Sequence, residues 1–318
     1  MTSRYLPLYV SSVLLLLLFV VGAAQFDGFA SLAVLTNLIS DNAFLLVTAL
    51  GMTLVILSGG IDLSVGSVIA LSGVAAALLI GPLGWHPLLA FALILPCAAL
   101  FGAGMGALIH YYQLQPFIVT LAGMFLARGV ATLLSEESVA IEHPFYDQLS
   151  EFGLSLPDGG WLGASSLLAL LLVLLVALLA HKSRFGGRIY ALGGNAQSAA
   201  LMGVPVARTT IQLYALSSLL AATAGLLLSL YTYSGYALAA VGTELDAIAA
   251  VVIGGTLLSG GVGFVLGTVL GVLLMGLIQT YITFDGSLSS WWSKIVIGLL
   301  LFGFIALQKV LQRGKTHG

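Results

Sequence analysis

Charged residues are rare in this sequence, and those that interrupt its apolar runs are the first candidates for chemistry. Asp62 and Ser64 follow a Gly-Gly pair, and Arg128 stands inside an apolar run. Glu244 and Asp246 precede another such run. An ionisable group in these surroundings is costly unless it pairs, reaches a polar boundary or faces a hydrated interior. These residue types predict either helix caps or the lining of a path for a polar solute.

The segment 57–67 leaves two interpretations open. Two adjacent glycines lower its helix propensity, and Asp62 or Ser64 could accept the backbone N–H groups at the start of a new helix. Alternatively, the break lies deeper and lines a cavity, because non-helical backbone at membrane depth is tolerated only inside protein or against water. A second Ser-Gly-Gly, residues 259–261, separates two later apolar runs in the same way.

Two further polar features also have two interpretations each. Thr243 is followed three residues later by Asp246, which is the form of a helix-capping box, although these residues could instead form a polar patch at an outer mouth. Arg128 either snorkels toward Glu136 or Glu137, or faces the interior of the protein. We expect the interior position for Arg128, paired with an acid of the outer mouth.

Other kinds of chemistry find no support in the sequence. The single cysteine, Cys97, excludes a disulfide framework and a cysteine-based metal site, and the five histidines are too dispersed for a metal cluster. No hydrolase or metalloprotease motif is present. Ten Lys and Arg scattered over 318 residues cannot supply the clustered phosphate contacts of a nucleic-acid-binding protein. We therefore expect neither an enzyme nor a resident metal or cofactor.

The elements that position these residues follow from composition. Some 60% of residues are apolar and 7% are charged, against roughly 45–50% and 25% in soluble domains. A spanning helix needs about 20 apolar residues. Division of the apolar runs at Gly, Pro and polar punctuation predicts an all-α integral membrane protein of about ten transmembrane helices, near residues 7–24, 38–57, 64–80, 88–109, 117–134, 163–181, 209–231, 243–258, 262–283 and 290–308.

Orientation follows from the two longest polar loops. Residues 135–160 carry six acids and no Lys or Arg, whereas 181–208 carry four Lys or Arg and no acid. By the positive-inside rule the first loop is periplasmic and the second cytoplasmic. Both termini are then cytoplasmic, since basic residues flank the first and last spans: Arg4, Lys309, Arg313 and Lys315. Neither loop is long enough for a soluble domain, so we expect residues 1–318 to form a single polytopic domain.

The cytoplasmic loop predicts a short surface helix. Asn195 is a natural N-cap and Gly203 a natural C-terminal stop, with Pro205 placed to open the next helix. The intervening helix would present small and apolar residues, including Ala199, Leu201 and Met202. Such a helix is suited to a groove on a partner protein.

Four blocks of this sequence together resemble the permease subunits of bacterial ABC importers for ribose, xylose, galactose and related sugars. The blocks are residues 50–67, 115–129, 193–204 and 244–261. Within that family the chain most resembles the permeases of galactofuranose importers. The likeness implies a type II ABC importer permease fold and, for this chain, a role as one of two membrane subunits in the bacterial inner membrane.

The resemblance also implies partners and site residues. The partners are a cytoplasmic ATP-binding subunit, a second permease copy or related permease, a periplasmic sugar-binding protein and membrane lipids, with ATP bound by the partner subunit alone. The short cytoplasmic helix becomes the coupling element for the ATPase, through Gly194, Asn195, Ala199, Leu201, Met202 and Gly203. The substrate pathway is assigned to Asp62, Ser64, Gln115, Phe117, Arg128, Glu244 and Asp246. The alternative function is an ion-coupled secondary transporter, which would need acids at mid-membrane.

Overall fold

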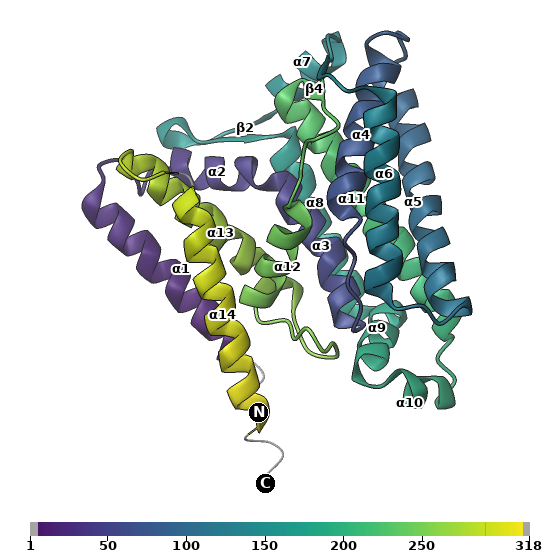
Figure 1. Cartoon of the computed structure of the whole chain (residues 1–318). Coiled ribbons are helices and arrows are strands. Elements are labelled where there is room, and N and C mark those ends of the chain that lie inside the picture. The colour runs from purple at the N-terminus through teal and green to yellow at the C-terminus, as the bar shows by residue number, and fades with distance from the viewer. Residues whose placement is uncertain (1–5, 290, 314–318) are drawn as a thin grey trace.

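The structure, a computed structural model, describes residues 6–289 and 291–313 as one bundle of helices (Figure 1). Two short antiparallel pairs of strands lie at one end of the bundle: β1 (Val139–Ala140) with β4 (Ser234–Gly235), and β2 (Gly153–Ser155) with β3 (Trp161–Gly163). A 3-10 turn, η2 (Pro157–Gly159), lies between β2 and β3. The helices are α1 (Leu6–Gln25), α2 (Leu32–Asp41), α3 (Ala43–Leu57), α4 (Val65–Ile80), α5 (Pro87–Tyr111), α6 (Pro116–Leu134), α7 (Pro144–Glu151), α8 (Ala164–Lys182), α9 (Arg184–Gly194), α10 (Ala196–Leu201), α11 (Val206–Thr232), α12 (Thr243–Ile253), α13 (Val265–Asp285) and α14 (Trp291–Arg313).

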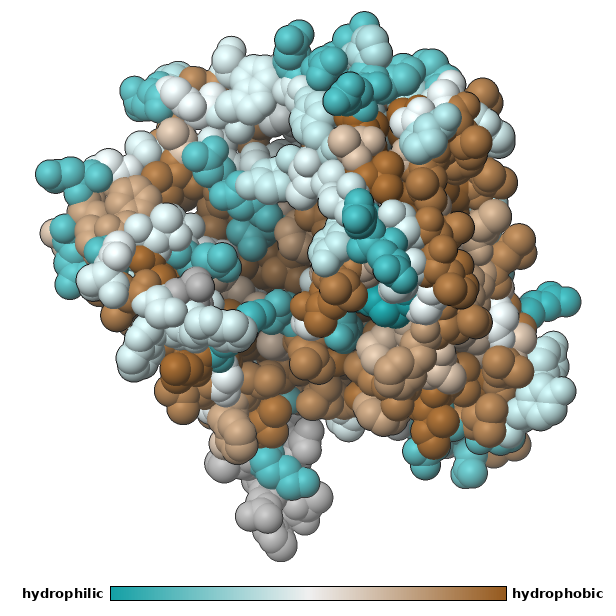
Figure 2. Space-filling model, turned by 45° about the horizontal axis from the view of Figure 1, so that its top comes forward, coloured by the Kyte–Doolittle hydropathy of each residue, from teal (hydrophilic) through white to brown (hydrophobic). Residues whose placement is uncertain are grey.

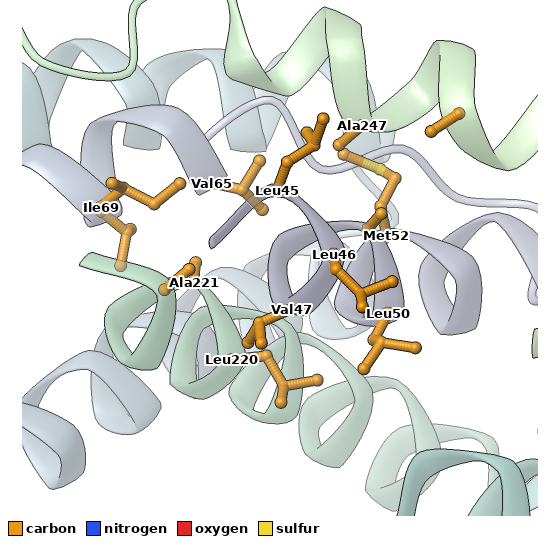
Figure 3. Close-up of a cluster of buried hydrophobic side chains, with 14 of the residues drawn as sticks. Leu45, Leu46, Val47, Leu50, Met52, Val65, Ile69, Leu220, Ala221 and Ala247 are labelled. Carbon is orange, nitrogen blue, oxygen red and sulfur yellow. The ribbon is translucent and has the colours of Figure 1, made fainter. Parts of the chain in front are cut away.

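Helix α3 forms the centre of the bundle. Every residue of α3 except Phe44 is buried, and its neighbours include α11, α4, α12, α8 and α13. Leu50 and Met52 of α3 belong to one apolar cluster with Ile69 of α4 and Leu220 of α11 (Figure 3). A helix that is apolar all round is stable only when it is surrounded, so the sequence of α3 dictates its central place.

The outer helices present apolar side chains to their surroundings. Leu133 of α6 is 89% exposed and Phe302 of α14 is 80% exposed. Hydrophobic residues also cover the flanks of the space-filling view (Figure 2). In water such a surface would be unfavourable, whereas in lipid it is the expected exterior.

Seven helices are long and apolar enough to cross a membrane, or eight if α2 and α3, which meet at an angle of 55°, count as one broken span. All ten predicted spans coincide with helices, but the count of ten is not confirmed. Helix α4 has 16 residues and α12 has 11. At 1.5 Å per residue they reach about 24 Å and 16 Å, short of the roughly 30 Å of a bilayer core.

The two short helices begin next to one another inside the protein. The chain between α3 and α4, residues 58–64, and the chain between β4 and α12, residues 236–242, contain no α-helix. A methyl group added at Gly66, in the first turn of α4, would overlap Oε2 of Glu244, in the first turn of α12. The N-terminal ends of α4 and α12 therefore meet. From this junction α4 runs toward the end of the bundle that contains α7 (Figure 1).

The two polar loops lie at opposite ends of the bundle. The acidic loop contains α7 and the basic loop contains α9 and α10, and these elements are at the top and the bottom of Figure 1. The start of α1 and the end of α14 lie at the α9–α10 end. Arg4 and Lys315, on which part of the predicted orientation depends, lie outside the described residues. Below, the α7 end is called the outer end and the α9–α10 end the inner end.

Candidate functional site

Two adjacent cavities open in the outer half of the bundle. Cavity A, of about 500 Å³, lies among α2, α3, α11, α12 and α13, and cavity B, of about 400 Å³, lies among α4, α11 and the chain that leads into α12. Phe44 and Thr243 line both cavities, so the two meet at the first residue of α12. The space-filling view, turned so that the outer end comes forward, shows hydrophilic side chains around a hollow in this face (Figure 2).

The lining of cavity A is unusually polar for a protein with so few polar residues. Its apolar members are Val34, Phe44, Leu45, Phe284 and the small residue Gly276. Its polar members are Asn37, Asp41, Asn42, Tyr231, Thr243, Asp246, Gln279, Thr280 and Thr283. Asp246 forms an ion pair with Lys294 of α14 at 2.7 Å. A cavity that mixes apolar faces with a few oriented polar groups is typical of a small-molecule site.

The acidic loop contributes Ser138 to the lining of cavity B and is tied to α11. The Tyr146 hydroxyl of α7 lies 3.1 Å from Oγ of Ser229, which lines cavity B. Burial raises the pKa of Tyr146 to about 12, so this hydroxyl stays protonated. The backbone N–H of Ile141 donates to the carbonyl of Tyr233 at 2.8 Å, next to the β1–β4 pair. The acidic loop therefore fixes the position of residues 233–235, which precede the irregular segment that leads into α12.

Arg128 is half-buried and points toward the chain that leads into α12, which is the interior one of the two positions that the sequence left open. It does not extend to Glu136 or Glu137, and it forms no ion pair within residues 6–289 and 291–313. Nη1 of Arg128 instead donates to the carbonyls of Ala237 and Ala239, at 2.5 and 2.8 Å. The expected pairing with an acid of the outer mouth is therefore wrong, although Glu244 is near enough to act on Arg128 electrostatically. The arginine satisfies carbonyls of the irregular chain that leads into α12.

The predicted capping box at Thr243 is also absent. Gly242 is the N-cap of α12, and no side chain caps the helix. Oε2 of Glu244 is buried and has no hydrogen-bond partner among the described residues. Glu244 points instead at the first turn of α4, where Gly66 leaves room for it. Two helix N-termini carry partial positive charge, so a carboxylate between them is electrostatically favoured.

Asp62 is completely buried, at 0% exposure, in the segment before α4. Its carboxylate accepts hydrogen bonds from the backbone N–H of Ser64, from the Ser64 hydroxyl and, at 2.7 Å, from Ser217 of α11. It does not cap α4, whose N-cap Ser64 makes no side-chain bond to the helix. The interpretation of a deep break inside the protein fits this geometry. Asp62 and Ser64 line neither cavity A nor cavity B.

The remaining pathway candidates divide between the two ends. Asp246 lines cavity A, and Glu244, the next residue after Thr243, lines neither cavity and lies against Gly66. Gln115 and Phe117 are exposed at the inner end of α6 and line neither cavity. The structure therefore does not bring the seven predicted residues together. Sequence reasoning missed Asn37, Asp41, Tyr231 and Gln279, although pairs of polar residues four apart on apolar helices were a usable signal.

At the inner end, α9 and α10 form a small platform. Asn195 caps α10, since its Oδ1 accepts from the backbone N–H of Ser198 at 2.8 Å. Gly203 ends it with φ of 81°, a left-handed conformation that suits glycine. Leu201 is 90% exposed and Met202 is 74% exposed, but Ala199 is fully buried. Ala199 therefore cannot belong to an exposed docking face, whereas Leu201 and Met202 can.

The α9–α10 platform contacts the end of α3 and the loop after α12 at Gly193. Gly193 of α9 leaves no space for a side chain, because a methyl group there would overlap the carbonyl of Leu57 and the N–H of Gly261. That N–H donates to the same Leu57 carbonyl at 2.9 Å. The platform thus meets the end of α3 and the loop after α12 at one point. Gly194, Asn195 and Gly203 remain exposed around it.

The polar side chains of the described residues gather in three places, none of which has the ligands of a metal site. Among the described residues, no three His, Cys, Asp or Glu side chains are grouped closely enough to hold a metal ion. The polar groups instead form an outer hollow, a junction of helix ends and an inner platform. This arrangement can admit a small polar solute from one side and receive a protein on the other.

Comparison with known proteins identifies relatives over almost the whole chain. A family model described as the permease component of a branched-chain amino acid transport system matches residues 34–305. The chain is 58% identical over 311 residues to inner membrane ABC transporter permease protein YjfF of Escherichia coli K12, covering 98% of this chain and 94% of that protein. It is 36% identical to fructose import permease protein FruG of Bifidobacterium longum, covering 97% and 92%. It is also 36% identical to ribose import permease protein RbsC of Escherichia coli K12, covering 94% and 93%. No solved structure matches the chain.

Proposed function

The chain belongs to this family of ABC transporter permeases, as its sequence suggested, and from that membership we propose that it is the membrane subunit of an ATP-driven sugar importer. The observation that carries the proposal is the identity over nearly the full length with permeases named for sugar import. A separate cytoplasmic ATPase would supply the energy, and a periplasmic sugar-binding protein would deliver the substrate.

The inner platform supports the coupling role. Leu201 and Met202 present apolar side chains on a capped helix at the basic end of the molecule. Apolar anchors that enter a groove are a common way for a helix to bind a partner. We assign the ATPase contact to Leu201 and Met202, with Gly194, Asn195 and Gly203 shaping the helix ends. Ala199 would support this helix from within.

We also propose ten passes through the bacterial inner membrane, with both termini cytoplasmic. Eight passes are the seven long helices and the α2–α3 pair. The other two combine a short helix with an irregular segment: residues 58–64 with α4, and residues 236–242 with α12. Irregular backbone at this depth is acceptable where it is buried in protein, as it is around Asp62 and Ser64, or where it lines a cavity, as Tyr236, Ala239 and Ala240 line cavity B.

Transport would proceed by alternating access. Thr243, the first residue of α12, lines both cavities, so we assign the closed floor between the cavities and the inner side to α12. ATP-driven movement of α9 and α10 would act through Gly193 on the end of α3 and the loop after α12. That movement would displace the floor and open the inner side. A second permease copy or a related permease would complete the pore.

The test is uptake by the assembled importer. The chain would be co-purified with its ATPase and binding protein, reconstituted with ATP inside proteoliposomes, and supplied with radiolabelled D-ribose, D-xylose, D-fructose and D-galactose. We expect ATP-dependent uptake of at least one sugar, and no uptake when the ATPase subunit is left out. Uptake that is driven by a proton or sodium gradient without the ATPase would contradict the proposal.

The alternative, an ion-coupled secondary transporter, has one structural observation in its favour. Asp62 is a fully buried acid, as a coupling site would need. Its three hydrogen bonds to Ser64 and Ser217 hold the carboxylate, however, and it lines neither cavity. The gradient-driven arm of the uptake experiment tests this alternative directly.

A further inference from the structure

Cavity A has the size of a small-molecule site and lies where a substrate from outside would arrive. Its volume of about 500 Å³ falls within the range of roughly 300–1,000 Å³ that is usual for such sites. Its walls come from the outer ends of α11 and α13, from the start of α12 and from α2. No comparison assigns a ligand to this cavity.

We propose that cavity A binds one neutral monosaccharide on its way from the outer surface to α12. This inference rests on the proposed transport function and specifies where in the chain the sugar is held and which chemistry selects it.

Free amide groups are the first argument. The side chains of Asn37 and Gln279 are exposed to the cavity and make no hydrogen bond among the described residues. Each amide offers two donors and one carbonyl acceptor, a combination that matches hydroxyl groups, which both donate and accept. Asn37 lies one turn from Asp41, and Gln279 lies one turn from Thr283, so each amide has a second polar group on its own helix face.

The charge of the lining is the second argument. Asp41 and Asp246 are its only ionisable acids, and Lys294 already pairs with Asp246. No lining residue is Lys or Arg. The N-terminus of α12 carries Glu244 and Asp246 in its first turn, which offset its partial positive charge. The carboxylate of a uronate, or that of a zwitterionic amino acid, would therefore find no free cationic partner in this wall, whereas a neutral sugar needs none.

The apolar part of the lining is the third argument. Phe44 and Phe284 supply aromatic surface beside the polar groups. A pyranose or furanose ring has C–H faces and a polar edge, so it can lie against an aromatic ring while its hydroxyls reach the amides. Tyr231, whose hydroxyl lies 3.3 Å from Oδ1 of Asp41, adds a further polar contact at the rim. The lining therefore offers both an apolar face and hydrogen-bonding groups to a neutral sugar.

The experiment measures protection of an introduced thiol in the full chain in nanodiscs. Cys97→Ala removes the native cysteine. Thr283→Cys then places a thiol in cavity A, and Ser155→Cys places a control thiol in the exposed β2–β3 hairpin. The rate of labelling by a charged thiosulfonate is measured without additive and with D-ribose, D-xylose, D-fructose, D-galactose, D-galacturonate or L-leucine at equal concentration.

We expect at least one neutral sugar to slow labelling of the Thr283→Cys variant several-fold, with no effect on the Ser155→Cys variant. Galacturonate and leucine should leave both rates unchanged. Adding Asn37→Leu and Gln279→Leu should abolish the protection, whereas Gln148→Leu, an exposed change in α7 outside the cavity, should preserve it.

Two results would overturn the inference: no neutral sugar protects the thiol in cavity A, or galacturonate or leucine protects it equally well. These failures are distinguishable from failure of the transport proposal. The thiol assay reports only on cavity A in the isolated chain, whereas the uptake assay reports on the assembled importer. Sugar uptake with an unprotected thiol would retain the importer and reject this site.

Discussion

At the scale of single residues, several polar side chains of this chain serve backbone carbonyls around α12. Arg128 donates to the carbonyls of Ala237 and Ala239, which precede α12, and Ser11 of α1 donates to the carbonyl of Ile253, the last residue of α12. Gln308 of α14 donates to the carbonyls of Val252 and Thr256. A short helix inside a membrane protein leaves carbonyls at its ends without partners in the helix, so side chains of neighbouring helices supply donors.

Arg128→Leu should destabilise the protein. It leaves the carbonyls of Ala237 and Ala239 without donors, at a cost of about 1–3 kcal/mol. We expect a melting temperature lower by a few degrees, measured by tryptophan fluorescence in detergent, and reduced sugar uptake. Arg128→Lys should lose less, because an ammonium group can still donate to one carbonyl.

The matched control for this change is Leu126→Ala, which removes a side chain from the exposed face of the same helix. It should leave both the melting temperature and uptake close to those of the native chain. If Arg128→Leu behaved like this control, the arginine would not stabilise the chain that enters α12.

At the scale of elements, the α9–α10 platform separates two jobs that the sequence had merged. Ala199 packs inward and Leu201 faces outward, because residues two apart on a helix point in different directions. A charge at Ala199 would therefore disrupt the platform itself, and only a charge at Leu201 or Met202 tests docking on a partner.

Leu201→Asp should uncouple the importer while leaving its fold intact. The new carboxylate would be buried without a partner in the apolar groove of the ATPase, which is costly. We expect loss of sugar-stimulated ATP hydrolysis by the reconstituted complex, with the melting temperature of the isolated chain unchanged. The control is Gln115→Asp, which adds the same charge to an exposed N-cap at the inner end of α6. Normal coupling in Leu201→Asp would reject the docking assignment.

At the scale of the whole molecule, charge is separated along the bundle. The acidic loop 135–160 and the basic loop 181–208 lie at opposite ends, as the positive-inside rule requires of two loops on opposite sides of a membrane. The loop between α4 and α5 lies at the acidic end, as we expect if α4 and residues 58–64 together complete one of the ten proposed crossings.

Cysteine accessibility tests this topology. In the Cys97→Ala background, Leu83→Cys and Ser155→Cys should react with a membrane-impermeant thiol reagent applied to intact spheroplasts. Gln197→Cys, in α10, should react only after the membrane is permeabilised. All three side chains are exposed, so differences report the side of the membrane. Labelling of Leu83→Cys only after permeabilisation would contradict the ten passes.

The sequence by itself determined the class of the protein, the approximate positions of its long helices, the presence of two oppositely charged polar loops and the caps of α10. These properties depend on local composition: long apolar runs, clustered charges, and Asn195 and Gly203 at fixed positions. The motifs also carried the family resemblance, which the relatives confirm. Such signals survive without knowledge of the fold because neighbouring residues alone produce them.

Only the tertiary structure decided which distant residues meet. Arg128 bonds to Ala237 and Ala239, more than a hundred residues later, and cavity A is assembled from α2, α3, α11, α12 and α13. The end of α12 at Ile253, before the predicted residue 258, was equally hidden, because an apolar run has the same composition whether it is helical throughout or broken inside protein. Side-chain partners depend on how helices pack, and apolar sequences of this kind allow many packings with similar local patterns.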